Sequence, residues 1–283
     1  MNFKKEIQKL QRNSIALKLG EQQLPEVVGS NRFGGAPDVP SDFVWPKYAA
    51  TTSDGQVIEP HPLSFIAQFN CSDLSALDTK CILPKTGVLA FFYEARTPRW
   101  GFDPKDKGCA KVFWFEDEKV LSVAKFPDDL EDEFRFSPRP IYLEREDNFP
   151  DFEDFALMHN LNYKNIDKFE TVQEELGIIP WELSTSKVLG WPILIQNNIT
   201  VECELASGGF YVGAGYSTVP KNKVNQANKH SLKTWRLLLQ FSAFDEDENY
   251  SMAIGDGYLY FYIREEDLRA GRFDDCWISF QCD

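Results

Sequence analysis

Histidine is scarce in this chain, and the motifs that identify common enzyme classes are missing. Three histidines, His61, His159 and His230, occur in 283 residues. The sequence has no Gly-x-Ser-x-Gly elbow, no Gly-x4-Gly-Lys-Ser/Thr phosphate loop, no His-Glu-x-x-His and no His-x-Glu ahead of a cysteine pair. These absences argue against serine hydrolases, P-loop nucleotidases, zinc peptidases and zinc deaminases, and we assign no catalytic residue.

Long apolar runs are missing as well. Residues 1–19 carry scattered charged side chains and no stretch long enough for a signal-peptide core or a membrane span. The six cysteines lie far apart, without a Cys-x-x-Cys pair or histidine at zinc-finger spacing, so they indicate free thiols in a reducing compartment. We therefore expect a cytoplasmic protein with no membrane partner, no metal and no cofactor.

Positive charge is in deficit. Forty-four acidic residues against thirty basic ones give a formal net charge of −14, which repels phosphate backbones and anionic lipid surfaces. Nucleic acid is therefore not an expected partner. A basic protein partner fits this charge, and so does an acidic surface that only keeps the protein soluble. The oligomeric state is not indicated.

What the chain does have is an aromatic-rich pattern that occurs twice. Each copy contains a glycine before a proline, an apolar segment with one glutamine, a glycine-led aromatic segment and a segment containing tryptophan. The first copy is Phe33–Pro37, Phe65–Phe69, Gly87–Tyr93 and Val112–Phe115, and the second is Leu189–Pro192, Leu238–Phe241, Gly257–Tyr262 and Trp277–Phe280. Repetition in the same order predicts a duplicated unit.

The expected fold class is α+β, with two duplicated, mainly antiparallel β units packed pseudo-symmetrically and a few helices. In that arrangement Gly34 should match Gly190, and Gln68 should match Gln240. We expect three parts of one compact fold: a first β-rich repeat with an N-terminal helix over 1–126, an acidic connector with helices over 127–186 and a second β-rich repeat over 187–283.

Hydrophobic spacing predicts the local elements. Residues 3–12 have a helical pattern, residues 15–19 alternate as a half-buried strand, and residues 151–176 have the spacing of two helices interrupted at 160–165. The stretch 220–229 is polar and indicates a loop.

Several spaced motifs resemble those of a known family. They are Arg32-Phe33-Gly34-Gly35-x-Pro37-x-x-Pro40, Trp45-Pro46, Pro62-Leu63-x-Phe65-Ile66-Ala67-Gln68, Leu83-Pro84-x-x-Gly87, Leu239-Gln240, Gly255-Asp256-Gly257 and Trp277. In these residues the chain resembles the YwqG-like domain of unknown function found in bacterial cytoplasmic proteins, over about residues 14–282. The resemblance implies an α+β fold with duplicated, largely antiparallel β units. The family has no established activity, so no catalytic residue is transferred.

Two glutamines interrupt apolar strands at equivalent places in the repeat, Gln68 and Gln240. A buried amide must satisfy its donors and its acceptor. Each glutamine either ties down the adjacent glycine-proline loop through backbone hydrogen bonds or lines a cleft between the two units and contacts a ligand. Trp191 has a similar pair of interpretations, as a core residue or as a stacking surface.

A ligand site is expected where the loops 32–40 and 190–192 approach the turn 255–257. Glycines permit close backbone approach there, and Arg32, Asp38 and Asp256 supply the polar groups. Purely structural turns explain the same residues. The candidate ligand-binding residues are Arg32, Asp38, Gln68, Trp191, Gln240 and Asp256. The acidic run Asp245–Glu248 could collect a hard cation, but it fails the calcium-loop pattern and indicates a solvated turn.

Two functions from different classes fit these observations. The first is a non-catalytic binding or interaction protein, one version of which is an immunity-type inhibitor of a basic partner. The second is an enzyme that acts on a small molecule in a cleft between the repeats, with Asp38 and Asp256 as candidate acid or base groups.

Overall fold

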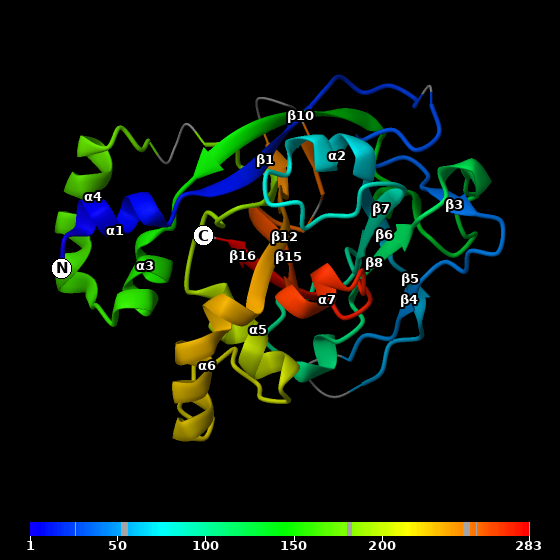
Figure 1. The fold of residues 1–283 in the computed structure, drawn as a ribbon. Helices are drawn as coiled ribbons and strands as arrows, with labels where there is room; N and C mark the ends of the chain where they lie inside the picture. Colours follow the sequence, from blue (N-terminus) through cyan, green and yellow to red (C-terminus); the bar gives the residue numbers. More distant parts are fainter. Residues whose placement is uncertain (26, 52–55, 180–182, 246–249, 253, 283) are drawn as a thin grey trace.

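The chain folds into a mixed α+β structure with one large antiparallel sheet (Figure 1). The computed structural model describes residues 1–25, 27–51, 56–179, 183–245, 250–252 and 254–282. Its α-helices are α1 (Phe3–Lys9), α2 (Cys71–Leu77), α3 (Phe152–His159), α4 (Ile166–Glu175), α5 (Ile199–Ser207), α6 (Lys221–Thr234) and α7 (Glu265–Arg269). Short 3₁₀ turns lie at Pro104–Asp106, Glu118–Val120, Asp132–Phe134 and Tyr163–Asn165.

Ten strands form the large sheet, and every neighbouring pair is antiparallel. In spatial order they are β16 (Trp277–Cys282), β15 (Gly257–Arg264), β12 (Trp235–Ser242), β11 (Lys187–Leu189), β1 (Arg12–Leu19), β10 (Arg139–Asn148), β2 (Arg32–Phe33), β6 (Ser64–Asn70), β7 (Val88–Tyr93) and β8 (Ala110–Phe115). Three two-stranded sheets pair β3 (Asp38–Pro40) with β9 (Leu121–Val123), β4 (Lys47–Tyr48) with β5 (His61–Pro62), and β13 (Phe244–Asp245) with β14 (Tyr250–Ser251).

The large sheet curls into a nearly closed barrel around an aromatic core. Phe33 of β2 stacks on Phe241 of β12 at 5.2 Å between ring centroids. Phe91 of β7 meets Phe261 of β15 at the same distance, 5.2 Å. In a flat sheet the strands β7 and β15 would lie roughly 30 Å apart. Their contact therefore requires the sheet to bend until its two ends face each other.

Strands β1 and β10 form the centre of the sheet and join its two ends. Their register runs from Arg12 opposite Asn148 to Leu19 opposite Ile141. On its other edge β1 pairs with β11, and β10 pairs with β2. β10 lies within the 127–186 stretch that the sequence indicated as a connector with helices, so this stretch also contributes a central strand.

The outer edge of the last strand is covered by another segment. The backbone N–H of Phe280 in β16 donates to the carbonyl of Trp100 at 3.2 Å, and the indole Nε1 of Trp277 donates to the carbonyl of Gly101 at 3.0 Å. Gly101 has φ +81°, and a Cβ there would lie 1.9 Å from the carbonyl oxygen of Ile278. The segment around Gly101 therefore packs directly on β16.

Three helices, α1, α3 and α4, form a helical lobe that stands beside the sheet (Figure 1). They share a small core that includes Phe3, Ile7, Phe155 and Phe169. The two predicted helices of 151–176 are present. They are separate because Asn160 adopts a left-handed conformation (φ +51°) that ends α3. None of the helices in the described part of the chain has both the length and the apolar character that crossing a bilayer requires.

The prediction of a loop at 220–229 is wrong, because Lys221–Thr234 forms α6. This helix has few apolar residues, but its inner face has helical spacing. Ala227 and Ser231 are buried, and Val224 packs against the cluster beneath α5 and β12. A narrow buried stripe of small residues is sufficient for a surface helix, and it gives little signal in the sequence.

Candidate functional site

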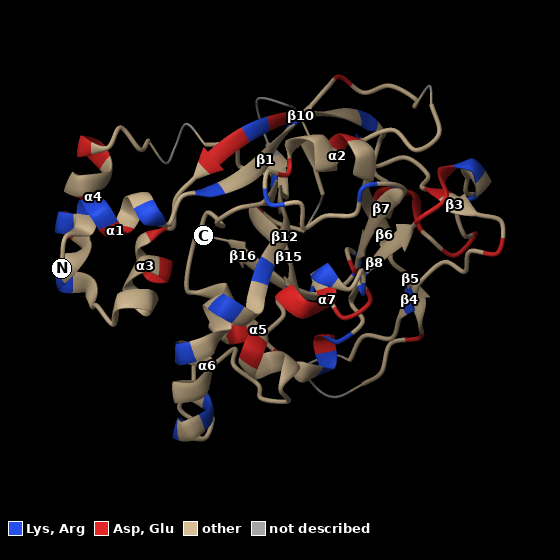
Figure 2. Cartoon of the chain, viewed as in Figure 1, with Lys and Arg blue, Asp and Glu red and all other residues tan. Residues whose placement is uncertain are grey.

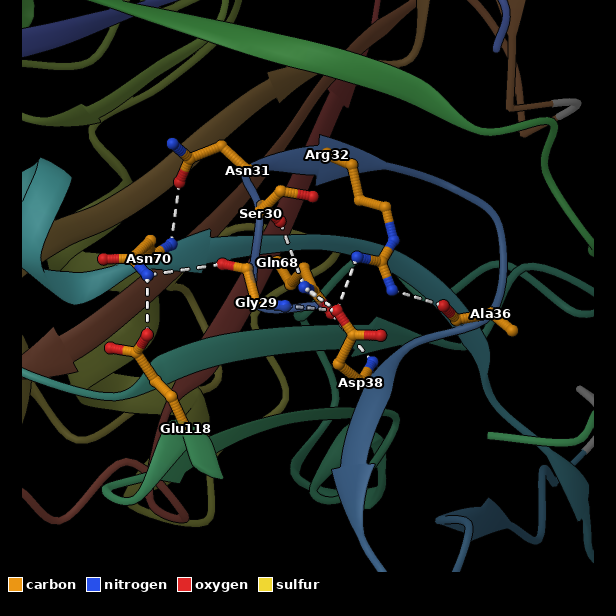
Figure 3. Close-up of polar contacts among 9 residues, drawn as sticks. All are labelled: Gly29, Ser30, Asn31, Arg32, Ala36, Asp38, Gln68, Asn70 and Glu118. Atoms are coloured by element: carbon orange, nitrogen blue, oxygen red, sulfur yellow. Dashed lines mark hydrogen bonds and ion pairs between the residues drawn. The ribbon is translucent and has the colours of Figure 1, made fainter. Parts of the chain in front are cut away.

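Two of the expected site residues, Arg32 and Asp38, form a buried ion pair (Figure 3). Arg32 Nη1 lies 2.7 Å from Asp38 Oδ2, which also accepts a hydrogen bond from the backbone N–H of Gly29 at 2.7 Å. The other terminal nitrogen of Arg32 donates to the carbonyl of Ala36 at 2.5 Å. Burial alone would raise the pKa of Asp38, but the hydrogen bond and charge of Arg32 outweigh it and lower this pKa below its usual value.

Gln68 holds the same loop against strand β6. Its Oε1 accepts from the backbone N–H of Asp38 at 2.9 Å. Its Nε2 donates to the carbonyl of Ser30 at 3.0 Å and to Asp38 Oδ2 at 2.7 Å. The side chain is fully buried. The predicted backbone hydrogen bonds of this glutamine are present.

A glycine pair turns the chain between the residues of this network. Gly34 (φ +59°) and Gly35 (φ +71°) follow the two-residue strand β2. A Cβ at Gly34 would lie 2.6 Å from the carbonyl oxygen of Ser137, so only glycine fits. The turn brings Asp38 back beside Arg32, which explains how residues six positions apart form an ion pair.

Gln240 makes a similar pair of backbone hydrogen bonds in the C-terminal part. Its Oε1 accepts from the N–H of Ile193 at 2.8 Å, and its Nε2 donates to the carbonyl of Thr185 at 2.6 Å. The loop between these two residues contains Gly190, which has φ +80°. A Cβ at Gly190 would lie 2.6 Å from Asn148 Oδ1.

The six expected ligand-binding residues fall into separate places. Arg32, Asp38 and Gln68 share one buried network, whereas Gln240 holds the loop that contains Trp191. Asp256 is exposed in the turn before β15. In the sheet order, β10 and β1 lie between β2 and β11, the strands that lead into the two glycine loops.

Trp191 lines a large cleft that the sequence did not reveal. We call it the lobe cleft: a cavity of about 1050 Å³ between the helical lobe and the helices α5 and α6. Its walls come from the end of α1, the start of β1, α3 and the residues after it, the loop at Trp191, the start of α5 and one face of α6. Figure 1 shows α6 and the helical lobe as neighbouring bodies at one side of the sheet.

The Arg12 guanidinium stacks on Trp191 in the wall of the lobe cleft. Its central carbon lies 3.3 Å from the centroid of the indole ring. The indole is 1% exposed, and its Nε1 donates to the carbonyl of Leu10 at 2.6 Å. The backbone of Trp191 exchanges two hydrogen bonds with the side chain of Asn148, at 2.6 and 3.0 Å. The ring is therefore a fixed platform for Arg12.

The Arg12 side chain has unused hydrogen-bonding capacity. Within the described residues, no acceptor lies at hydrogen-bond distance from its guanidinium and no carboxylate lies at ion-pair distance. Burial, with a smaller effect from nearby Arg236, lowers the pKa of Arg12 to about 10. The group stays charged at neutral pH, so a cation with free donors faces the lobe cleft.

The lobe cleft is basic although the protein is acidic. Among the described residues of its lining, five side chains are basic and one, that of Glu153, is acidic. The basic residues are Lys9, Arg12, Lys229, Lys233 and Arg236. In Figure 2 the blue segments on α1 and along α6 mark basic residues.

Two buried carboxyl groups lie behind the wall of the cleft. Asp154 of α3 accepts a hydrogen bond from the Nδ2 of Asn198, and Asp151 accepts from the N–H of Leu194 at 2.6 Å. Burial, with a contribution from Asp151, raises the pKa of Asp154 to about 7. Burial also raises the pKa of Asp151 to about 6. Partial protonation of Asp154 near neutral pH reduces the negative charge that it sets against Arg12.

The described residues contain no group of three or more histidine, cysteine or acidic side chains placed to hold a metal ion. The acidic run at 245–248 lies outside the described residues from position 246 onward. Among the described residues that line the lobe cleft there is no histidine, cysteine, serine or threonine.

Apart from Trp191, the residues of the lobe cleft were missed for two reasons. Arg12 lies far from Trp191 in the sequence, and no motif links the two. Lys229 and Lys233 belong to a helix whose polar composition indicated a loop. A signal was present in the spacing of Val224, Ala227 and Ser231, which lie on one helical face.

Comparison with known proteins gives one finding. A search of curated proteins finds no match to this chain. A family model described as a domain of unknown function (DUF1963) matches residues 31–282. The matched region contains Trp191 and all of α6, whereas Lys9 and Arg12 precede it. Because the match spans most of the chain, the protein belongs to the DUF1963 family.

Proposed function

We propose that the protein is a non-catalytic binding protein whose ligand occupies the lobe cleft. The observation that carries this proposal is the Arg12 guanidinium, which is held on Trp191, faces the cavity and has no acceptor among the described residues. A charged group with free donors in a preformed cavity is a typical anchor for a ligand. The cavity volume of about 1050 Å³ lies near the upper end of the usual range for small-molecule sites.

The composition of the lining supports binding rather than catalysis. The described residues that line the lobe cleft offer no nucleophile with an adjacent base, and Glu153 is the acid among them. Trp191 is one of the ligand-binding residues expected from the sequence. The ligand-binding role of the others, Arg32, Asp38, Gln68, Gln240 and Asp256, stays a prediction.

An enzyme acting on a small molecule is the alternative. Its support is Asp154, a carboxyl group near Arg12 whose pKa burial raises to about 7, within the range of a general acid or base. Asp38, one of the acid or base candidates from the sequence, is already used by Arg32.

Neutralisation of a basic protein is a further candidate for the outer surface. Its support is the net charge of −14 and the acidic residues of β10, coloured red in Figure 2. Affinity capture on the immobilised protein at moderate salt should recover a stoichiometric basic partner. Repeated recovery of the protein alone would count against an inhibitor of this kind.

We also propose that the two ends of the sheet derive from one duplicated unit. Support comes from two matching hydrogen-bond patterns. Gln68 bonds the carbonyl two residues before its strand partner Arg32 and the N–H six residues after it. Gln240 does the same around its strand partner Lys187. Strands β6 and β12 also have register shifts at matching places, Phe65/Ala67 and Leu237/Leu239.

This register corrects one expectation about the glycines. It pairs Gly35 with Gly190 and Gly34 with Leu189, so the expected match of Gly34 to Gly190 is one residue out. The backbone angles agree with the new pairing, since φ is +59° at Gly34 and +61° at Leu189. A crystal structure tests the duplication: β2, β6, β7 and β8 should superimpose on β11, β12, β15 and β16 with Gln68 over Gln240. Glutamines on non-superimposable strands would refute it.

A reducing, cytoplasmic setting in a bacterium is part of the proposal. All six cysteines are free in the structure, as expected of thiols in a reducing compartment. The bacterial origin and the YwqG-like assignment rest on the resemblance of the sequence motifs.

A blocked cleft tests the proposed function. Asn228 is exposed on α6 and lines the lobe cleft, whereas Asn222 is exposed on the same helix and is not part of the lining. A thermal-shift screen of anionic, neutral and cationic small molecules should identify compounds that raise the melting temperature of the wild type, since ligands stabilise the state that they bind. Asn228→Trp should lose that shift and Asn222→Trp should keep it. A screen without any hit sensitive to Asn228→Trp refutes the proposal.

A further inference from the structure

We propose that the ligand of the lobe cleft is a compact polyanion, a small molecule with two or more phosphate or carboxylate charges anchored by Arg12. This inference rests on the proposed function and names the chemical class of the ligand. It follows from the unpaired positive charge in the cleft, the rigidity of the anchor and the amide side chains of the lining.

Three of the five cations in the described lining of this cleft have no carboxylate partner among the described residues. Arg236 is already bound to Glu265, and Lys9 donates to Glu6 at 2.8 Å. Arg12, Lys229 and Lys233 have no carboxylate within ion-pair distance in the part of the chain that the structure describes. In a chain with a net charge of −14, three such cations around one cavity create a local positive potential that attracts an anion.

Arg12 is oriented before any ligand arrives. Its guanidinium lies over the indole of Trp191, whose Nε1 donates to the carbonyl of Leu10 and whose backbone is bonded to the side chain of Asn148. Little side-chain freedom remains to be lost on binding, which favours affinity. A planar guanidinium presents parallel N–H groups that match the two oxygens of a phosphate or carboxylate. Burial of this group strengthens its attraction for an anion relative to an exposed charge.

The remaining lining combines amide side chains with apolar ones. The amides Gln11, Asn160, Asn197, Asn225 and Asn228 also face the cavity. Amide side chains donate to oxygen atoms and accept from hydroxyl groups. The amides therefore offer contacts to the polar groups of such a ligand, and the cleft volume of about 1050 Å³ limits the ligand to roughly the size of a nucleotide or smaller.

Extended nucleic acid is disfavoured by the rest of the surface. A polymer that followed the cleft outward would meet a protein with a net charge of −14, which repels a phosphate backbone. A compact anion avoids this repulsion because its charges stay beside the basic side chains of α6 and β1.

Paired lysine substitutions on one helix provide a matched test. All four residues Lys221, Lys223, Lys229 and Lys233 are exposed on α6, and of these Lys229 and Lys233 line the cleft. The double variants Lys229→Gln/Lys233→Gln and Lys221→Gln/Lys223→Gln remove the same charge from the same helix. Titration calorimetry with tripolyphosphate, ATP and citrate should show about tenfold weaker binding for the first variant and less than about threefold for the second.

Substitution of the anchor gives an independent readout. Arg12→Gln should weaken binding by at least about tenfold, because it removes the charge and the paired donors. Arg12→Lys keeps the charge but loses the planar fork, so its affinity should fall between those of Arg12→Gln and the wild type. Circular dichroism and the melting temperature of each variant verify that it is folded.

The three probes also distinguish the sources of the anion. Equal binding of ATP and tripolyphosphate indicates a phosphate site, binding of ATP alone indicates a nucleotide, and preferred citrate binding indicates a polycarboxylate. The proposal of a polyanion ligand is overturned if none of the three probes binds, or if the two double lysine variants lose affinity equally. A neutral or cationic compound that binds the wild type, is lost in Asn228→Trp and is unaffected by Arg12→Gln also overturns it, but leaves the proposed function intact.

Discussion

Buried amide and carboxylate side chains hold the irregular loops of this protein against its sheet. Gln68 and Gln240 each bond backbone groups on both sides of a glycine turn, and the ion pair of Arg32 with Asp38 closes the first of these loops. Each of these polar groups is buried away from water. The folded state therefore loses stability if the group lacks a hydrogen-bond partner. The energetic role of a single side chain is therefore measured best where its partners are known.

The first residue-scale prediction concerns Gln68. Gln68→Leu leaves the N–H of Asp38 and the carbonyl of Ser30 without their partner, so we expect the free energy of unfolding to fall by about 1–3 kcal/mol. Urea denaturation followed by circular dichroism measures the change. The control Gln226→Leu alters an exposed glutamine of α6 and should stay within about 0.5 kcal/mol of the wild type. An unchanged midpoint for Gln68→Leu would contradict the inferred role.

A second residue-scale prediction concerns pH and Glu202, which is 6% exposed in α5. Burial raises the pKa of Glu202 to about 7. In the unfolded chain a glutamate has a pKa of about 4.3, so as pH rises the unfolded state loses its proton first. The stabilisation present at low pH is therefore lost between about pH 4 and pH 7.

Glu202→Gln should remove this dependence on pH. We expect the variant to gain about 2–3 kcal/mol over the wild type between about pH 4 and pH 8, measured by guanidinium denaturation across that range. Glu174→Gln, at an exposed position of α4, serves as the control. If the free energy of unfolding has the same slope against pH in the wild type and in Glu202→Gln, the carboxyl does not titrate as its burial implies.

At the scale of elements, turns at the ends of short strands determine where the glycine loops lie. Strand β2 contains two residues, and the chain reverses immediately after it through the left-handed pair Gly34 and Gly35. At the end of β11 a turn uses Leu189 and Gly190, and Trp191 after it lines the lobe cleft. Both turns approach other backbone or side chains closely, so they tolerate little added volume.

The element-scale prediction separates crowding from backbone strain. Gly34 and Gly177 both have positive φ, +59° and +67°, but a Cβ at Gly34 meets the carbonyl of Ser137 at 2.6 Å and a Cβ at Gly177 meets nothing within 4 Å. Gly177→Ala should lower the free energy of unfolding by the roughly 1–2 kcal/mol of the left-handed backbone alone. Gly34→Ala should lower it by clearly more. If urea denaturation gives equal losses of unfolding free energy for the two variants, the contact of the new Cβ at position 34 with the carbonyl of Ser137 relaxes without cost.

Sequence patterns predicted those elements whose burial follows a simple period. The helices of 151–176 combined phenylalanine and leucine at helical spacing with a break at Asn160, and both are present. β10 was missed because only two of its ten residues, Ile141 and Asn148, are buried, so it lacks an apolar pattern. Its place at the centre of the sheet depends on backbone pairing with β1, which local sequence does not encode.

At the scale of the whole molecule, the candidate site required contacts that no local pattern contains. The aromatic strands and the polar loops near Arg32 were visible in the sequence, but the lobe cleft is assembled from β1, α3, the loop at Trp191 and α6. Its basic character opposes the overall acidity, so composition gave no indication of it. Long-range packing, rather than motif or charge, creates this site.

The central position of β1 leads to a prediction for the whole chain. β11 pairs with β1 on one edge, so the fragment 187–283 would leave that edge without its neighbour. We expect this fragment, expressed alone, to show no cooperative thermal transition by circular dichroism, whereas the full chain should unfold in one. A cooperative transition of the isolated fragment would mean that 187–283 is an autonomous domain.

The covering of β16 has a consequence for self-association. An open edge strand offers unpaired N–H and carbonyl groups to other chains and is a common starting point for aggregation. In this protein the segment containing Trp100 and Gly101 lies against the last strand, bonded to Phe280 and to the indole of Trp277. A second molecule therefore cannot extend the sheet at β16 without first displacing that segment, so the C-terminal edge is protected from edge-to-edge polymerisation.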